Sequence, residues 1–192
     1  MVTYQSKKSV IGVVLAGGKS SRMGSNKALL QYKNKFFIDH AIELLKKLGA
    51  SKIMISGNIV GYDCTPDLAL HKGPLGGVFS IMEILDQSST NVKLLFIPVD
   101  MPLLTVDLLN NLLIQLLDYD AACYKKHPLP FALSSNRRVQ EALKKQYYSQ
   151  LKGGSLRNFQ ASIQTNILEI LQPEEICFSN INTPEDLSQH LN

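Results

Sequence analysis

Cysteine is scarce in this sequence, and the three that occur, Cys64, Cys123 and Cys177, lie far apart with no CxxC pair among them. An odd, dispersed set argues against a disulfide framework and against a cysteine-rich zinc site. Long hydrophobic runs are also lacking at the start of the chain, where a polar and basic segment, 1–9, precedes an apolar run only as long as a strand. This pattern argues against a signal peptide or a membrane span. We therefore expect a protein of the reducing cytoplasm with no membrane partner.

The balance of charge is mildly positive, with 20 basic and 16 acidic residues and a formal net charge of +4. This balance suits an anionic ligand, but the basic residues are too few and too scattered to indicate a nucleic-acid surface. The 192 residues include 45% hydrophobic residues and show no linker, repeat or low-complexity tract. We expect a single domain over residues 1–192 and a monomeric protein.

Short apolar runs alternate with helical patterns along the whole chain. The spacing of apolar and turn-forming residues predicts strands at 10–15, 52–56, 68–71, 92–98, 121–124, 131–134 and 167–171. It predicts helices at 37–48, 75–85, 138–148, after an N-cap at Thr105 as far as 117, and from Ser155 and Thr183 onward. This alternation indicates the α/β class, with a mostly parallel, Rossmann-like sheet in a three-layer α/β/α arrangement.

Three loops fall at the carboxyl ends of predicted strands, at 16–27, 56–58 and 98–102. In an open α/β sheet, ligands bind at that edge. The first of these loops is rich in glycine, and its Arg22 and Lys27 offer cationic donors. Glycines allow the backbone N–H groups to approach a phosphate, and the cations add charge-assisted donors. The loop therefore predicts an anion site.

Two common nucleotide motifs are absent from this loop. Gly18-Lys19-Ser20 has the ending of a P-loop, but the motif needs glycine at position 13, where this chain has Val13. The dinucleotide fingerprint GxGxxG does not occur. A kinase, GTPase or NAD-binding function therefore loses its main support.

Several segments together resemble the molybdenum cofactor nucleotidyltransferase family, and within it the guanylyl-transferring members. The resemblance covers nearly the whole chain in the order of the family's motifs. The segments are Leu15-Ala16-Gly17-Gly18, Ser21-Arg22-Met23-Gly24, Lys27-Ala28-Leu29-Leu30, Gly73-Pro74-Leu75-Gly76-Gly77, Pro98-Val99-Asp100-Met101-Pro102, Pro128-Leu129-Pro130, Gly154-Ser155-Leu156-Arg157 and 180–187.

This resemblance implies that GMP passes from GTP to the phosphate of the molybdopterin cofactor and that pyrophosphate is released. It implies a nucleotidyltransferase fold whose N-terminal half binds the nucleotide and whose C-terminal half binds the acceptor. Mg²⁺ is the implied cofactor, and proteins that deliver the cofactor or mature molybdoenzymes are possible partners. Gly17-Gly18 favours guanine, since the cytidylyl relatives usually have alanine in place of the first glycine.

The resemblance also assigns residues to roles. The catalytic group is Arg22, Lys27 and Asp100, and Asp100 is the metal ligand. The nucleotide-binding group is Leu15, Ala16, Gly17, Gly18, Lys27, Ser56, Asn58, Asp67, Gly73, Pro74, Leu75 and Asp100. The acceptor-binding group is Arg157, Asn180 and Asn182.

Two positions depart from the family pattern. Asp67 is one residue out of its usual spacing to Gly73, and Ser56 stands where the family often has asparagine, with Asn58 two residues on. Both positions fall in the region that binds the base, so the choice of base rests on the remaining motifs.

The proposed chemistry suits these residue types. Attack of one phosphate on another needs positioning and neutralisation of negative charge. A hard carboxylate such as Asp100 suits Mg²⁺, which takes few protein ligands, and Arg22 and Lys27 can stabilise the leaving pyrophosphate. No general base is needed, because a phosphate ester is already ionised near neutral pH.

Other interpretations remain open at this point. The chain could transfer a cytidylyl group to molybdopterin, or a nucleotide to a sugar phosphate or another phosphorylated metabolite. It could also be a nucleotide-binding regulatory module without catalysis. Locally, Asp100 could cap the following helix, Asn180 and Asn182 could be turn residues, and Arg157 could be a lone surface cation.

Overall fold

The computed structural model describes residues 9–17, 27–68, 73–85, 92–148, 155–181 and 186 of the 192. The predicted strand 68–71 falls outside these ranges apart from Leu68, which lies in a bend. The predicted final helix also falls outside them except for Asp186, which is helical. Within the described residues, no helix is long and apolar enough to span a membrane.

A six-stranded sheet in the order β4-β1-β5-β7-β6-β8 forms the centre of the molecule. Its strands are β1 (Val10–Leu15), β4 (Lys52–Ser56), β5 (Lys93–Pro98), β6 (Ala121–Tyr124), β7 (His127–Ser134) and β8 (Thr165–Leu168). β1 pairs in parallel with β4 and β5, and β6 pairs in parallel with β8. β7 pairs antiparallel with both of its neighbours, so the prediction of a mostly parallel sheet is confirmed.

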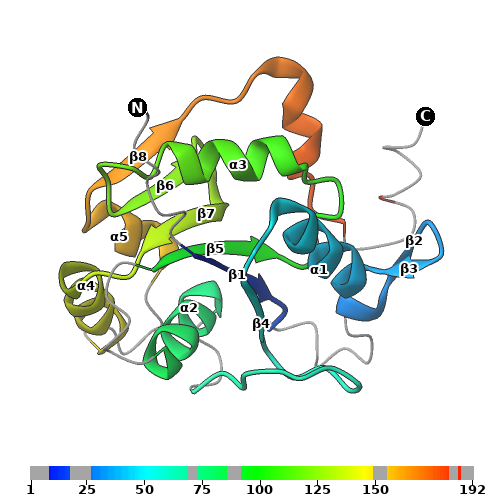
Figure 1. Cartoon of the computed structure of the whole chain (residues 1–192), viewed down its shortest axis with the longest axis horizontal. Helices are drawn as coiled ribbons and strands as arrows, with labels where there is room; N and C mark the ends of the chain where they lie inside the picture. The colour runs from blue at the N-terminus through cyan, green and yellow to red at the C-terminus, as the bar shows by residue number, and fades with distance from the viewer. Residues whose placement is uncertain are drawn as a thin grey trace, which may run out of the picture.

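Helices cover both faces of this sheet (Figure 1). α1 (Phe37–Leu48) and α3 (Val106–Ile114) pack together on one face, and α2 (Gly73–Ile84), α4 (Arg137–Tyr148) and α5 (Leu156–Ala161) pack on the other. Alternate residues of β1 point to opposite faces, so Val14 joins the core under α1 and α3 while Val13 joins the core under α2, α4 and α5. The three-layer α/β/α prediction is therefore confirmed.

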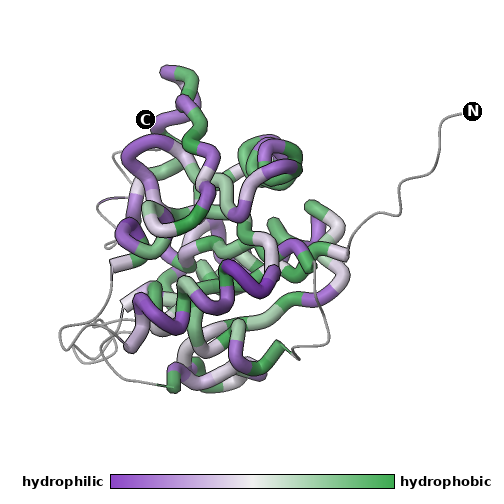
Figure 2. Tube along the Cα trace, turned by 90° about the vertical axis from the view of Figure 1, so that its left-hand side faces the viewer, coloured by the Kyte–Doolittle hydropathy of each residue, from purple (hydrophilic) through white to green (hydrophobic). Residues whose placement is uncertain are grey.

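α1 shows why the local pattern predicts these helices well. Its apolar residues Ile38, Ala41 and Leu45 are buried, while charged residues occupy the outer side. Figure 2 shows hydrophilic and hydrophobic residues following one another along such helices. Gly49 ends the helix with φ 85°, a left-handed conformation that glycine adopts without strain.

Several boundaries differ from the predicted ones. The helix expected to reach Leu117 ends at Ile114, and Leu117, beyond its end, is 70% exposed. β7 begins four residues earlier than predicted, at His127. β8 covers Thr165–Leu168 rather than 167–171, because Asn166 and Ile167 pair with Ala122 and Cys123 of β6.

Four short elements were not predicted from the sequence. A small two-stranded sheet pairs β2 (Gln31–Tyr32) with β3 (Lys35–Phe36), and 3-10 helices occupy η2 (Lys27–Leu29) and η3 (Gln172–Phe178). η2 matters for the site because it holds Lys27, while its neighbour Ala28 is fully buried in the core.

Candidate active site at the carboxyl edge of the sheet

The carboxyl ends of β4, β1 and β5 lie side by side at one edge. The N–H of Ala16 donates to the Ser56 carbonyl at 2.9 Å, and the N–H of Val99 donates to the Leu15 carbonyl at 3.1 Å. These bonds extend the strand ladder one residue beyond its regular end. The first residues of two loops are therefore held as firmly as the strands, which suits a site that must position a ligand.

A cleft of about 530 Å³ opens at this edge. Its walls come from both halves of the chain, so it joins segments that are more than a hundred residues apart. The lining residues are Leu15, Ala16, Gly17, Lys27, Pro74, Pro98, Val99, Asp100, Met101, Lys126, His127, Pro128, Leu129, Arg157 and Asn180.

Lys27 and Asp100 face each other across the cleft. Lys27 Nζ lies 3.6 Å from Asp100 Oδ2, and the two side chains are 31% and 23% exposed. The Asp100 carbonyl accepts a hydrogen bond from the Ile181 N–H at 2.8 Å, which ties this strand end to the C-terminal segment. Partial burial weakens screening by solvent, so the pair sets a strong local field.

Asp100 does not cap the following helix. Thr105 is the N-cap of α3, and its hydroxyl accepts from the Leu108 N–H at 3.4 Å. The alternative in which Asp100 serves as a cap is therefore excluded, and its carboxylate is directed to the cleft instead.

One carboxylate fits a magnesium site of the kind that substrate phosphates complete. Among the described residues, no three His, Cys, Asp or Glu side chains gather into a metal site made by protein alone. Mg²⁺ commonly takes one or two carboxylates, several waters and the phosphates of its nucleotide. The donor at Asp100 has the right chemistry for this mode of binding.

Ser56 and Asp67 lie beside Gly17. The Ser56 hydroxyl donates to Asp67 Oδ1 at 2.8 Å, and Ser56 is 1% exposed. Oδ2 of Asp67 faces Gly17, since a Cβ at position 17 would lie 2.7 Å from it. Glycine is thus required at position 17 for the Asp67 carboxylate to lie where it does.

The other residues expected to bind nucleotide differ in whether they reach the cleft. Pro74 lines the cleft, and Gly73 begins α2 beside it. Leu75 is fully buried in the core beneath α2, so only its backbone can face a ligand. Asn58 is exposed beyond the end of β4. Gly18, Arg22 and Asn182 lie outside the described residues.

Arg157 and Asn180 line the cleft on the side of β6 and β7. Arg157 Nη2 donates to the Lys126 carbonyl at 2.6 Å, which fixes the guanidinium beside the β6–β7 turn. Arg157 is exposed and lines the cleft, and its role in binding the acceptor stays a prediction. The sequence did not single out Lys126, although two adjacent lysines before a histidine were the available signal.

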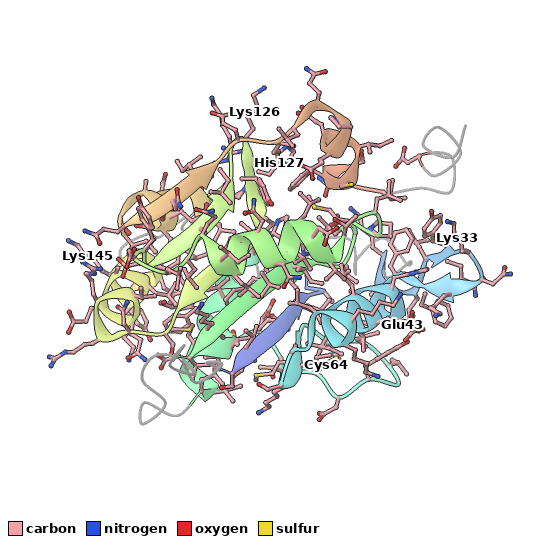
Figure 3. The ribbon with its side chains drawn as sticks, turned by 45° about the horizontal axis from the view of Figure 1, so that its top comes forward. Lys33, Glu43, Cys64, Lys126, His127 and Lys145 are labelled. Atoms are coloured by element: carbon pink, nitrogen blue, oxygen red, sulfur yellow. The ribbon has the colours of Figure 1, made fainter. Side chains whose placement is uncertain are left out.

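His127 stands at the same turn (Figure 3). Its ring packs against Phe178 with centroids 4.6 Å apart. Burial lowers the pKa of His127; the charge of Glu175 opposes this shift, and those of Arg157 and Lys126 add to it. His127 is therefore neutral at pH 7 and can donate or accept a hydrogen bond.

A second cavity of about 370 Å³ adjoins the cleft. Lys126, His127, Pro128 and Arg157 line both spaces. Cys123, Ala161, Ile163 and Ile167 add apolar surface, and burial raises the pKa of the Cys123 thiol. The cavity thus combines an apolar floor with a cationic rim.

Residues 12–165 match the family model of the MobA-like NTP transferase domain. The chain belongs to this family. The nucleotidyltransferase activity predicted from the motifs is therefore confirmed.

Curated relatives of this chain carry a more specific name than the family model does. A "Molybdenum cofactor guanylyltransferase" of Xanthomonas euvesicatoria pv. vesicatoria is 36% identical over 178 residues, covering 93% of this chain and 92% of the relative. A "Probable molybdenum cofactor guanylyltransferase" of Flavobacterium johnsoniae is 32% identical, covering 91% and 93%. The resemblance found in the motifs is thus confirmed over most of the chain.

Solved structures support the fold. "Molybdopterin-guanine dinucleotide biosynthesis protein A" from Archaeoglobus fulgidus has a TM-score of 0.70 at 18% identity, covering 94% of this chain and 96% of that one. A 4-diphosphocytidyl-2C-methyl-D-erythritol synthase from Anaerococcus prevotii also has a TM-score of 0.70, at 12% identity, covering 95% and 94%. One fold therefore accompanies enzymes with different names, so the fold does not decide which base or acceptor is used.

Proposed function

We propose that this chain transfers GMP from GTP to the phosphate of the molybdopterin cofactor and releases pyrophosphate. The observation that carries the proposal is the Lys27–Asp100 pair, 3.6 Å apart in a cleft between the two halves of the chain. The names of the curated relatives support both the guanine and the acceptor.

In the proposed reaction, an oxygen of the acceptor phosphate attacks the α-phosphorus of GTP. The bond between the α-phosphorus and the oxygen that bridges to the β-phosphate breaks, and pyrophosphate leaves with the bonding electrons. The acceptor is already ionised, so no side chain has to remove a proton. Asp100 would hold Mg²⁺, which would supply positive charge to the triphosphate.

The protein contributes position and charge to this reaction. We propose that the Lys27 ammonium group contacts the triphosphate and that Arg22 makes a second contact with the leaving group. Leu15, Ala16 and Gly17 line the cleft, and because the Ala16 N–H is already donated to the Ser56 carbonyl, Gly17 is the one of the three whose N–H we propose for the nucleotide. The α2 N-terminus at Gly73 and Pro74 adds its positive dipole end. Each contact is stronger toward the transition state, in which negative charge moves onto pyrophosphate.

The acceptor is proposed to lie on the side of Arg157, Asn180 and Asn182. Its phosphate would point into the cleft toward Asp100, and its flat ring system would occupy the adjoining apolar cavity. We also propose that the protein is a cytoplasmic monomer and that cofactor-delivery proteins supply its acceptor.

The test is to follow pyrophosphate release with purified molybdopterin as acceptor and GTP, CTP or ATP as donor, with Mg²⁺ present. GTP is expected to support release at the highest kcat/KM. Equal or better turnover of CTP would overturn the guanine assignment. Turnover only with a sugar phosphate would overturn the acceptor, and nucleotide binding without any turnover would show a regulatory module.

Replacement of Arg157 by alanine is expected to raise the KM for the acceptor by about tenfold, the equivalent of one charge-assisted hydrogen bond. The KM for GTP should stay the same, because Arg157 belongs to the C-terminal wall. Arg137→Ala is the matched control, since Arg137 is an exposed arginine on α4 paired with Glu141. An equal rise in both KM values would contradict the placement of Arg157 on the acceptor side.

A further inference from the structure

Ser56 is buried at the end of β4, against a position of α2 where only glycine leaves room for its hydroxyl. Its hydroxyl donates to Asp67 Oδ1 at 2.8 Å. On its other side lies Gly77 of α2, where a Cβ would come within 2.6 Å of Ser56 Oγ. The hydroxyl is thus confined between α2 and the Asp67 carboxylate, with little freedom to turn toward a ligand.

The backbone around Asp67 is fixed independently. The N–H of Leu68 donates to Ser80 Oγ at 2.8 Å, and the Ser80 hydroxyl donates to the Gly76 carbonyl at 2.9 Å. Ser80 is fully buried in α2. On the other side of Asp67, the N–H of Thr65 donates to the Ile55 carbonyl at 2.7 Å. Bonds to β4 and α2 therefore hold the chain on both sides of this aspartate.

The second oxygen of Asp67 lies against Gly17, which lines the cleft, although Asp67 itself is not among the lining residues. Oδ2 lies 2.7 Å and Oδ1 3.7 Å from the position a Cβ at Gly17 would take. Among the described residues, no donor is hydrogen-bonded to Oδ2. Ser56 therefore sets the plane of the carboxylate and directs its other oxygen toward Gly17.

We propose that Ser56 is a positioning residue for base selection, which acts through Asp67 and does not contact the nucleotide. This inference rests on the proposed function. The predicted role of Ser56 as a direct base contact is replaced by an indirect one. Ser80 supports the same carboxylate through the Leu68 backbone.

The chemistry of the bases explains why a fixed carboxylate would favour guanine. Guanine presents two adjacent donors, N1–H and the exocyclic amino group, and an ionised carboxylate only accepts. Adenine and cytosine each present one amino donor next to an unprotonated ring nitrogen, whose lone pair repels a carboxylate. A carboxylate that rotates freely would lose conformational entropy when guanine binds. That loss would offset part of the binding free energy that favours guanine over the other bases.

The experiment compares Ser56→Ala, Asp67→Ala and the double variant in the full chain, with steady-state kinetics and calorimetric binding of GTP, ATP and CTP. Ser56→Ala is expected to raise the KM and Kd for GTP by about tenfold, with kcat nearly unchanged and ATP and CTP little affected. The double variant is expected to bind GTP no more weakly than Asp67→Ala alone, because Ser56 acts through Asp67.

Two further variants serve as the control and as an independent test of the Ser56 position. Ser51→Ala is the matched control, since the Ser51 hydroxyl donates to the Val10 carbonyl at the opposite end of the same two strands. Gly77→Ala would bring a Cβ within 2.6 Å of the Ser56 hydroxyl and 2.9 Å of the Leu15 side chain. It should raise the KM for GTP as Ser56→Ala does, and it should add nothing in an Asp67→Ala background if it acts through Ser56 rather than Leu15.

The outcomes separate this inference from the proposed function. Additive losses in the double variant would show that Ser56 contacts the nucleotide itself, and unchanged GTP selectivity in Ser56→Ala and Gly77→Ala would show that it positions nothing. Either result would overturn the inference while the wild-type protein still transfers GMP. A wild-type protein that does not use GTP would instead overturn the proposed function.

Discussion

Asp100→Asn is expected to lower kcat by about a thousandfold while weakening GTP binding much less. The substitution keeps the size of the side chain but removes the negative charge that we propose holds Mg²⁺. Loss of a group that stabilises transition-state charge costs about two to three orders of magnitude in enzymes with preorganised sites. The backbone and cationic contacts to the triphosphate remain, so the nucleotide stays bound. Single-turnover kinetics and calorimetric GTP binding with Mg²⁺ measure the two effects separately.

The control for this experiment is Asp107→Asn. Asp107 is an exposed aspartate in the first turn of α3, seven residues along the chain from Asp100. It should retain the wild-type kcat. If Asp100→Asn retained it too, the metal site would have to lie elsewhere, and the Lys27–Asp100 ion pair would have only a structural role.

The second large effect is expected on stability, from Asp120→Ala. Asp120 is 1% exposed and joins three parts of the chain. Its carboxylate accepts from Asn136 at 2.9 Å, from Arg138 at 2.7 Å and from the Gln164 N–H at 3.1 Å. Alanine would remove these three hydrogen bonds to a charged group; because Arg138 is 60% exposed and water can solvate it, we count about 1 kcal/mol for each bond, about 3 kcal/mol in all. A protein of this size should then melt about 6–12 °C lower.

The pH dependence of this effect follows from the pKa of Asp120. Burial by itself would raise that pKa, but the hydrogen bonds from Asn136, Arg138 and Gln164 and the charge of Arg138 outweigh it, so the pKa is lowered. A carboxyl whose folded-state pKa is lowered stabilises the protein fully above its unfolded pKa, about 4, and less as the pH falls through the folded value. The difference between the wild-type protein and Asp120→Ala should therefore be constant near neutral pH and shrink below about pH 4.

Asp118→Ala provides the comparison for stability, because Asp118 is exposed two residues earlier in the same turn. Its melting temperature should equal that of the wild-type protein at every pH. A difference between wild type and Asp120→Ala that did not shrink in acid would show that packing, rather than the charge of Asp120, stabilises this junction.

The elements predicted correctly from the sequence are those whose pattern is local. β1 and α1 have the predicted bounds because a β-branched run and a helical repeat each end at glycine. β7 could not be placed as well, because Pro128 and Pro130 argue against a strand. The structure places them where the β6–β7 register shifts and before the β5–β7 pairs begin at Phe131, so the missing N–H groups interrupt no regular ladder there.

Among the candidate site residues, too, the features that are local in sequence could be predicted and those that depend on packing could not. Asp100 and the glycine loop were recognisable because motifs and strand ends are contiguous in sequence. The contact of Asp67 with Gly17, and the confinement of Ser56 by Gly77, depend on how α2 packs against β4 and β1. Leu75 matched a motif, yet its side chain turned into the core, since a motif identifies a segment but not the side that faces a ligand.

The reversed direction of β7 has a consequence for how such enzymes diverge. Because β6 runs with the parallel strands and β7 returns against them, the turn between Tyr124 and His127 lies at the edge where the cleft opens. That turn supplies residues to both cavities, yet it contributes nothing to the ladder of β4, β1 and β5. If the acceptor binds on this side as proposed, a change in the length or composition of this turn would alter the acceptor and leave the proposed nucleotide side intact, so substrate range could evolve on one half of the sheet independently of the other.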